Sequence, residues 1–199
     1  MSKLLWILQI VVMVALWPLQ ARAESQTAQD LVVSTTDQVL KTLRDESGGN
    51  DPQATLGAID RLIMPHVDLA KMSQRLLGEQ WLNASAEQQD RFNGELRKLL
   101  VKTYAAVFQQ YANAKIAYLP GLTNPAGNIA IVKSRVTNES ASPVSIDYQL
   151  GQQNGEWKLT DVAVGGVSLV ANYRASFGKL VGAKGIDGLT TALSAHNQS

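Results

Sequence analysis

The sequence has no cysteine, which excludes disulfide bonds, thiolate nucleophiles and cysteine metal ligands. Histidine is almost as scarce: only His66 and His196 occur, and neither has a second histidine at metal-ligand spacing. We therefore expect no metal site and no cofactor, and packing alone must hold the fold together. We interpret His66 as a surface or packing residue.

A charge excess of either sign is also missing. The chain has 18 Lys and Arg against 17 Asp and Glu, a net charge of +1. Nucleic-acid binding needs a basic surface that displaces counterions, and attachment to anionic headgroups needs a basic patch. The near-neutral composition therefore argues against nucleic acid as a partner.

Residues 1–23 have the pattern of a cleaved secretory signal. Lys3 gives a positive start, residues 4–19 form a short apolar run, and residues 21–23 (ARA) match a small-x-small cleavage site. The run contains Gln9 and Pro18 and is shorter than the ~20 apolar residues of a spanning helix. We predict that the mature chain begins at Glu24 and that residues 24–199 form a single domain.

Helical periodicity covers both ends of this domain. Apolar residues recur at helical spacing over residues 29–44, 52–64, 69–77 and 86–111, and again after Ser168 as far as Gly182. Asp68 and Ser168 stand at N-cap positions, and residues 85–88 (SAEQ) form a capping box. A last short helix is predicted from Gly185.

Alternating apolar residues predict antiparallel strands in the middle of the chain. The alternation runs through residues 116–118, 129–131 and 144–150, and Asn154-Gly155 predicts a hairpin turn to a strand over residues 157–164. The apolar parity changes within that last strand, which predicts a bulge or bend near Thr160 and Asp161. The fold class is therefore α+β, with helices wrapped on one face of a curved antiparallel sheet.

Catalytic motifs are not visible. Ser168 lies in residues 166–170 (GVSLV), which lack the second glycine of a nucleophile elbow, so a helix cap is the better interpretation. Asp60, Asp68, Asp147 and Asp161 are scattered and form no evident acid–base pair. The residues favour a protein that is not an enzyme.

Several short segments stand out by their order and spacing. They are residues 64–68 (MPHVD), 77–81 (LGEQW), 85–92, 155–158 (GEWK), 161–162 (DV), 165–169 (GGVSL), 173–174 (YR) and 185–189 (GIDGL). Together they resemble the MlaC or toluene-tolerance family of periplasmic phospholipid-binding proteins, and the resemblance covers nearly all of the mature chain.

The resemblance implies a cone-shaped fold related to the nuclear-transport-factor-like class, with phospholipid acyl chains between helices and sheet. It also implies a monomeric periplasmic carrier that exchanges phospholipid with an outer-membrane lipoprotein complex and with the inner-membrane substrate-binding component of an ABC transporter. Such a pathway maintains outer-membrane lipid asymmetry. Two alternatives stay open, a periplasmic adaptor without lipid cargo and a lipid-acting hydrolase.

Helical faces and strand parity suggest which large residues point inward, and from these we predict the wall of the lipid pocket. A diacyl cargo would need a pocket near or beyond the upper end of the usual ~300–1,000 Å³ range. The predicted wall comprises Leu76, Leu77, Trp81, Leu96, Leu99, Leu100, Tyr104, Phe108, Ile131, Val136, Ile146, Tyr148, Trp157, Val164, Val167, Tyr173 and Phe177.

Overall fold

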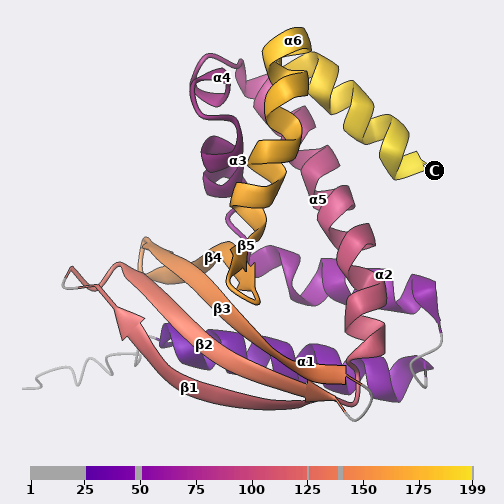
Figure 1. Ribbon diagram of the computed structural model, residues 1–199, viewed down its shortest axis with the longest axis vertical. Coiled ribbons are helices and arrows are strands. Elements are labelled where there is room, and N and C mark those ends of the chain that lie inside the picture. The colour runs from indigo at the N-terminus through magenta and orange to yellow at the C-terminus, as the bar shows by residue number, and fades with distance from the viewer. Residues whose placement is uncertain (1–25, 48–50, 125, 139–140, 199) are drawn as a thin grey trace, which may run out of the picture.

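The computed structural model describes residues 26–47, 51–124, 126–138 and 141–198, so the predicted signal segment lies outside the described residues. The helices, as Figure 1 labels them, are α1 (Ala28–Ser47), α2 (Pro52–Leu62), the 3₁₀ turn η1 (Met64–His66), α3 (Leu69–Leu77), α4 (Glu79–Leu82), α5 (Ala86–Gln110) and α6 (Leu169–Gln198). Gly185 interrupts α6 with a φ of 66°, where the sequence predicts a new helix.

The strands form one antiparallel sheet in the order β1-β2-β3-β4-β5. Each strand therefore pairs with its neighbour along the chain. Their bounds are β1 (Lys115–Thr123), β2 (Ile129–Asn138), β3 (Ala141–Gln153), β4 (Glu156–Val164) and β5 (Val167–Ser168). The α+β class predicted from the sequence is confirmed.

The predicted helix starts have the expected capping contacts. The Asp68 carboxylate accepts from the backbone N–H of Lys71 at 2.8 Å, and Ser85 forms both hydrogen bonds of a capping box with Gln88. Ser168 accepts from the backbone N–H of Ala171 at 3.0 Å. These side chains satisfy N–H groups that have no partner within the helix.

Both irregularities predicted in the β3–β4 hairpin are present. Asn154 and Gly155 have φ values of 51° and 83°, as a tight two-residue hairpin turn requires. Gln149 pairs with Asp161 and Leu150 with Leu159. Thr160 therefore has no opposite residue in β3 and forms a β-bulge. After the bulge, each side chain of β4 points to the opposite face of the sheet from the one that uninterrupted alternation would give.

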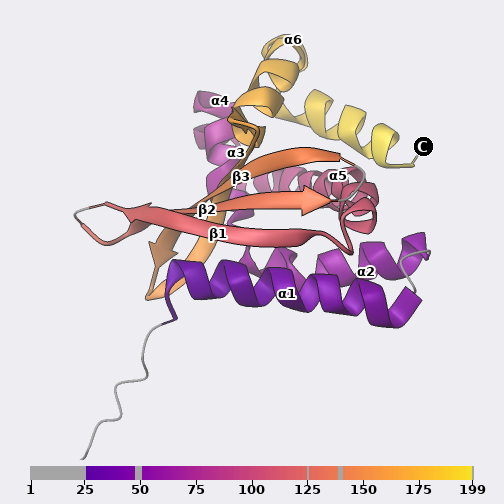
Figure 2. The same cartoon turned by 60° about the horizontal axis from the view of Figure 1, so that its bottom comes forward.

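The helices pack against the sheet in two places. Helix α1 lies along one face of the sheet, where Leu31 and Val32 contact Ala130 and Val132 of β2 (Figure 2). Helices α3, α4, α5 and α6 pack around Phe92 and form a second core near the β4 edge (Figure 1). An apolar cavity lies between these two contact regions.

Candidate functional site

An apolar cavity of about 380 Å³ lies between the inner face of the sheet and helices α1, α2, α3 and α5. Strand residues Ile146 and Tyr148 of β3 form its floor together with Val162 of β4. The C-terminal half of α5 and the inward side of α1 form the walls opposite. The full lining is Leu31, Val32, Thr35, Thr36, Leu40, Ile59, Ile63, Met64, His66, Val67, Met72, Leu100, Tyr104, Val107, Phe108, Tyr111, Ala114, Ile116, Val136, Val144, Ile146, Tyr148, Leu150, Leu159, Val162, Val164 and Leu169.

The polar atoms of the wall are largely hydroxyls. Burial raises the pKa of the Tyr104 hydroxyl of α5, with the neighbouring Tyr173 of α6 as a lesser cause. Burial raises the pKa of Tyr148 to about 12, although the neighbouring Ser134 hydroxyl opposes the shift. These hydroxyls stay neutral at physiological pH, so they add no charge to the wall.

His66 is the one cavity-lining residue that titrates near neutral pH. Burial lowers the pKa of His66 below its ordinary value of 6.5, and the nearby Lys158 ammonium lowers it further. Lys158 is held beside η1 because its ammonium donates to the Pro65 carbonyl at 3.0 Å. The neutral imidazole is therefore favoured, which keeps this part of the wall uncharged.

Two valines mark where the cavity reaches the surface. Val107 of α5 and Val164 of β4 both line the cavity, yet their residues are 45% and 38% exposed. Val164 is followed by the Gly165-Gly166 turn, in which both glycines have positive φ values, and then by the start of α6. The cavity mouth is therefore bounded by α5 on one side and by the β4–β5–α6 connection on the other.

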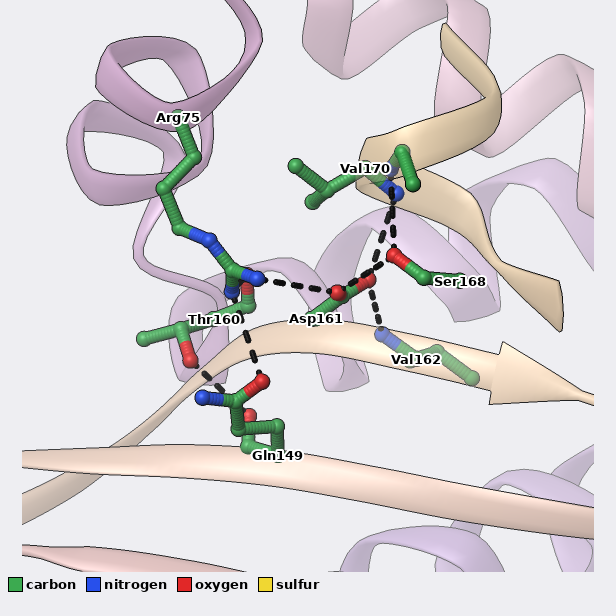
Figure 3. Close-up of polar contacts among 8 residues, drawn as sticks. Arg75, Gln149, Thr160, Asp161, Val162, Ser168 and Val170 are labelled. Atoms are coloured by element: carbon green, nitrogen blue, oxygen red, sulfur yellow. Dashed lines mark hydrogen bonds and ion pairs between the residues drawn. The ribbon is translucent and has the colours of Figure 1, made fainter. Parts of the chain in front are cut away.

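A buried carboxylate holds that connection in place (Figure 3). Asp161 Oδ1 accepts from the backbone N–H of Val162 at 2.8 Å and of Val170 at 3.2 Å. Its Oδ2 accepts from Ser168 Oγ at 2.6 Å and from Arg75 Nη2 at 3.2 Å. We call these five residues the Asp161 clasp; they tie β4, the start of α6 and α3 together.

The β-bulge places this carboxylate where the helices can reach it. Tyr148 pairs with Val162 and Gln149 with Asp161, so Val162 faces the cavity and Asp161 faces the opposite side. Arg75 approaches that side from α3 and also donates to the Thr160 carbonyl at 3.3 Å. The extra residue Thr160 thus places Val162 in the cavity wall and Asp161 on the opposite face, where it bonds residues of α3 and α6.

The structure brings together seven of the residues predicted for the pocket wall. These seven line the cavity and come from α5 and from β2, β3 and β4: Leu100, Tyr104, Phe108, Val136, Ile146, Tyr148 and Val164.

The other predicted wall residues lie elsewhere. Trp157 packs on the α1 end of the sheet, Ile131 lies on the opposite face of β2 from Val136, and Val167 is 61% exposed. A further group belongs to or packs against the helical core of α3 to α6: Leu76, Leu77, Trp81, Leu96, Leu99, Tyr173 and Phe177.

The expected volume is not observed. At about 380 Å³ the cavity is near the lower end of the range for ligand pockets, not the upper end. The reason is the division of α5, whose N-terminal half packs Phe92, Leu96 and Leu99 against other helices. Only its C-terminal half is left to face the sheet.

Sequence reasoning missed the rest of the cavity lining, which comes from α1, α2, η1 and α3 as well as from further positions of α5 and the strands, and it missed the role of Asp161. Leu31 and Val32 of α1 line the cavity, although their helical spacing was visible in the sequence. Asp161 was interpreted as one of several scattered carboxylates. Its partner Arg75 lies 86 residues earlier in the chain, and no local pattern indicates such a contact.

Within residues 26–47, 51–124, 126–138 and 141–198, no helix combines the length and apolarity needed to cross a bilayer. In the same part of the chain, no three His, Asp or Glu side chains gather as a metal-binding group.

A largely apolar cavity that lies between helices and a curved sheet and opens at a mouth is the kind of site that can hold an apolar ligand. The family described as MlaC protein matches residues 33–195, and the chain belongs to this family.

Relatives with known descriptions agree with that assignment. The chain is 28% identical over 181 residues to toluene tolerance protein Ttg2D of Pseudomonas putida, covering 89% of this chain and 83% of that protein. It is 26% identical over 148 residues to the intermembrane phospholipid transport system binding protein MlaC of Haemophilus influenzae, covering 72% and 68% of the two chains.

A solved structure has the same fold. The phospholipid-binding protein of Ralstonia solanacearum, determined in complex with a phospholipid, superimposes with a TM-score of 0.78 at 28% identity, covering 86% of this chain and 97% of that one.

Proposed function

We propose that this protein is a periplasmic phospholipid carrier that holds acyl chains in the cavity between α1, α5 and the sheet. The observation that carries the proposal is the cavity itself, whose wall is almost entirely aliphatic and aromatic. A relative with the same fold was solved with a phospholipid bound. The cargo is thus a phospholipid, and no cofactor is needed for this function.

The energetics of burial explain why such a carrier retains its cargo. Burying roughly thirty methylenes of a diacyl lipid at ~0.8 kcal/mol each removes about 24 kcal/mol of gross hydration cost. The net affinity is smaller, because ordering of the lipid and desolvation oppose binding. Spontaneous release into water is nevertheless slow, so lipid leaves when the protein is docked on a partner.

The proposed route joins the two membranes of the cell envelope. The predicted signal segment, residues 1–23, directs export, and residues 24–199 form the carrier domain, which works as a monomer. One relative is described as the binding protein of an intermembrane phospholipid transport system. By analogy, this chain exchanges phospholipid with an outer-membrane lipoprotein complex and with the substrate-binding component of an inner-membrane ABC transporter, maintaining outer-membrane lipid asymmetry.

Native mass spectrometry of the exported protein, purified without detergent, tests the proposal. We expect discrete mass additions that lipid extraction resolves into diacyl phospholipids. A bare polypeptide mass under gentle conditions, together with a stoichiometric protein complex, would instead support an adaptor that carries no lipid.

A further inference from the structure

The cavity and the proposed cargo differ in size. About 380 Å³ lies near the lower end of the range that holds a drug-sized ligand, and a diacyl phospholipid is larger. Loading such a lipid therefore requires the walls to separate. The question is which contacts resist that separation.

Polar contacts of Asp161 contribute to holding the sheet side of the mouth. Val162, Val164 and Leu169 line the cavity, and all three lie within eight residues of Asp161 in the chain. The Asp161 residue is only 5% exposed and receives four hydrogen bonds, two of them from the backbone of the wall-bearing segment. Separating β4 from the start of α6 or from α3 breaks the bonds to Ser168, Val170 and Arg75, whereas the bond from the adjacent Val162 stays within β4.

Apolar contacts at the mouth are weaker. Val164 and Val167 are 38% and 61% exposed, and the two glycines between them have positive φ values and no side chain to pack. Exposed apolar residues contribute little burial energy that would resist movement. The Asp161 clasp therefore adds a polar restraint to the β4–β5–α6 connection. It acts beside the backbone bond from the Gly165 N–H to the Ser145 carbonyl at 2.9 Å and the burial of Val170 in the helical core.

We propose that the Asp161 clasp, which joins Asp161 to Arg75, Ser168 and the backbone of Val162 and Val170, restrains widening of the cavity and sets how fast lipid enters and leaves. This inference rests on the proposed function. Asp161 acts as a positioning residue, because its carboxylate faces away from the cavity and the residue is not part of the lining. Arg75 is the accessible end of the clasp, with 37% of its side chain exposed.

The test uses the mature protein loaded with a fluorescent phosphatidylethanolamine and mixed with acceptor vesicles of phosphatidylcholine. Asp161→Asn keeps the side-chain size but loses the charge and one acceptor. Ser168→Ala removes the hydroxyl that donates to Asp161 and caps α6 at the Ala171 N–H. Arg75→Gln removes the guanidinium that donates to Asp161, to the Thr160 carbonyl and to Gln149. Loss of a hydrogen bond to a charged group changes an opening equilibrium about tenfold or more. We therefore expect lipid transfer about tenfold faster in Asp161→Asn, with smaller increases in the other two.

Two controls separate positioning from general loss of stability. Asp187→Asn removes an exposed ion pair with Arg91 just after the Gly185 break in α6, and neither residue lines the cavity. Leu193→Ala lowers the melting temperature from within the helical core without touching the clasp. Both should transfer lipid at close to the parent rate, and only the clasp variants should show faster hydrogen exchange at the Val170 amide.

Three outcomes would overturn the inference. If folded Asp161→Asn transfers lipid at the parent rate, control by the clasp is excluded. If Asp161→Asn fails to fold, parent transfer rates in both Ser168→Ala and Arg75→Gln exclude it. Equally fast transfer in Leu193→Ala at a matched melting temperature would attribute the effect to global stability. A parent protein that takes up no lipid would refute the proposed function itself, and that result is visible in the loading step before any rate is measured.

Discussion

Removing the cargo should lower the stability of the fold, because an empty cavity gives its lining residues no partner. In protein cores, cavity volume costs about 24 cal/mol per Å³ when the walls do not relax. For the about 380 Å³ observed here, that slope gives an upper limit of roughly 9 kcal/mol. Total stabilities of domains are about 5–15 kcal/mol, so the empty protein should be markedly weakened.

The gain on loading follows from mass action. Lipid that binds only the folded state at a concentration a thousandfold above its Kd adds about 4 kcal/mol. For a chain of this length, each 1 kcal/mol raises the melting temperature by about 2–4 °C, which gives a shift of roughly 8–16 °C.

Calorimetry of loaded and lipid-stripped protein measures this shift directly. A matched pair of variants checks its origin: Val136→Phe fills the cavity from its wall, whereas Val167→Phe adds the same bulk at an exposed position outside the lining. Val136→Phe should lose most of the lipid-dependent shift, and Val167→Phe should keep it. Equal melting temperatures for loaded and stripped parent protein would refute the reasoning.

Three further predictions concern titratable residues of the wall. The pKa of His66 is lowered in the folded protein, so the unfolded state binds the proton more readily and the free energy of unfolding falls as pH drops below 6.5. Urea unfolding between about pH 7 and about pH 5 should show a smaller decrease in this free energy for His66→Gln than for the parent. Tyr104→Asp places a charge among the acyl chains, and lipid co-purified with this variant, measured by mass spectrometry, should decrease; unchanged lipid would count against this position. The Tyr148 pKa of about 12 means that stability is lost as pH rises above about 10, and circular dichroism should show less alkaline unfolding in Tyr148→Phe.

Local features of this fold could be predicted from the sequence because they depend on neighbouring residues. Asp68, Ser85 and Ser168 cap helices through bonds to N–H groups three residues ahead. Asn154 and Gly155 adopt the positive φ values that their turn needs. Such contacts are determined by a few adjacent side chains, and residue type and spacing identify them.

The cavity wall could be predicted only in part, because periodicity does not say what a face touches. The apolar side of α5 is continuous in sequence, and at 1.5 Å per residue its 25 residues span about 37 Å. Leu96 packs on other helices, while Tyr104, two turns later, faces the cavity. The position along α5 at which the helical core ends and the cavity begins depends on how α6 and the sheet are placed. No residue of α5 encodes that position.

Asp161 shows how a local prediction and a non-local contact combine. The parity change in β4 was sufficient to predict the bulge, and a bulge at Thr160 requires Asp161 and Val162 to exchange faces. A carboxylate turned away from an apolar face needs hydrogen-bond donors if it is buried. Ser168, seven residues later and predicted as a cap, is one such donor, and Arg75 supplies the charge. The sequence pattern is thus an acidic residue at a β-bulge, followed by a Gly-Gly turn and a capping serine. This pattern indicates that the carboxylate joins the strand to the helix that follows.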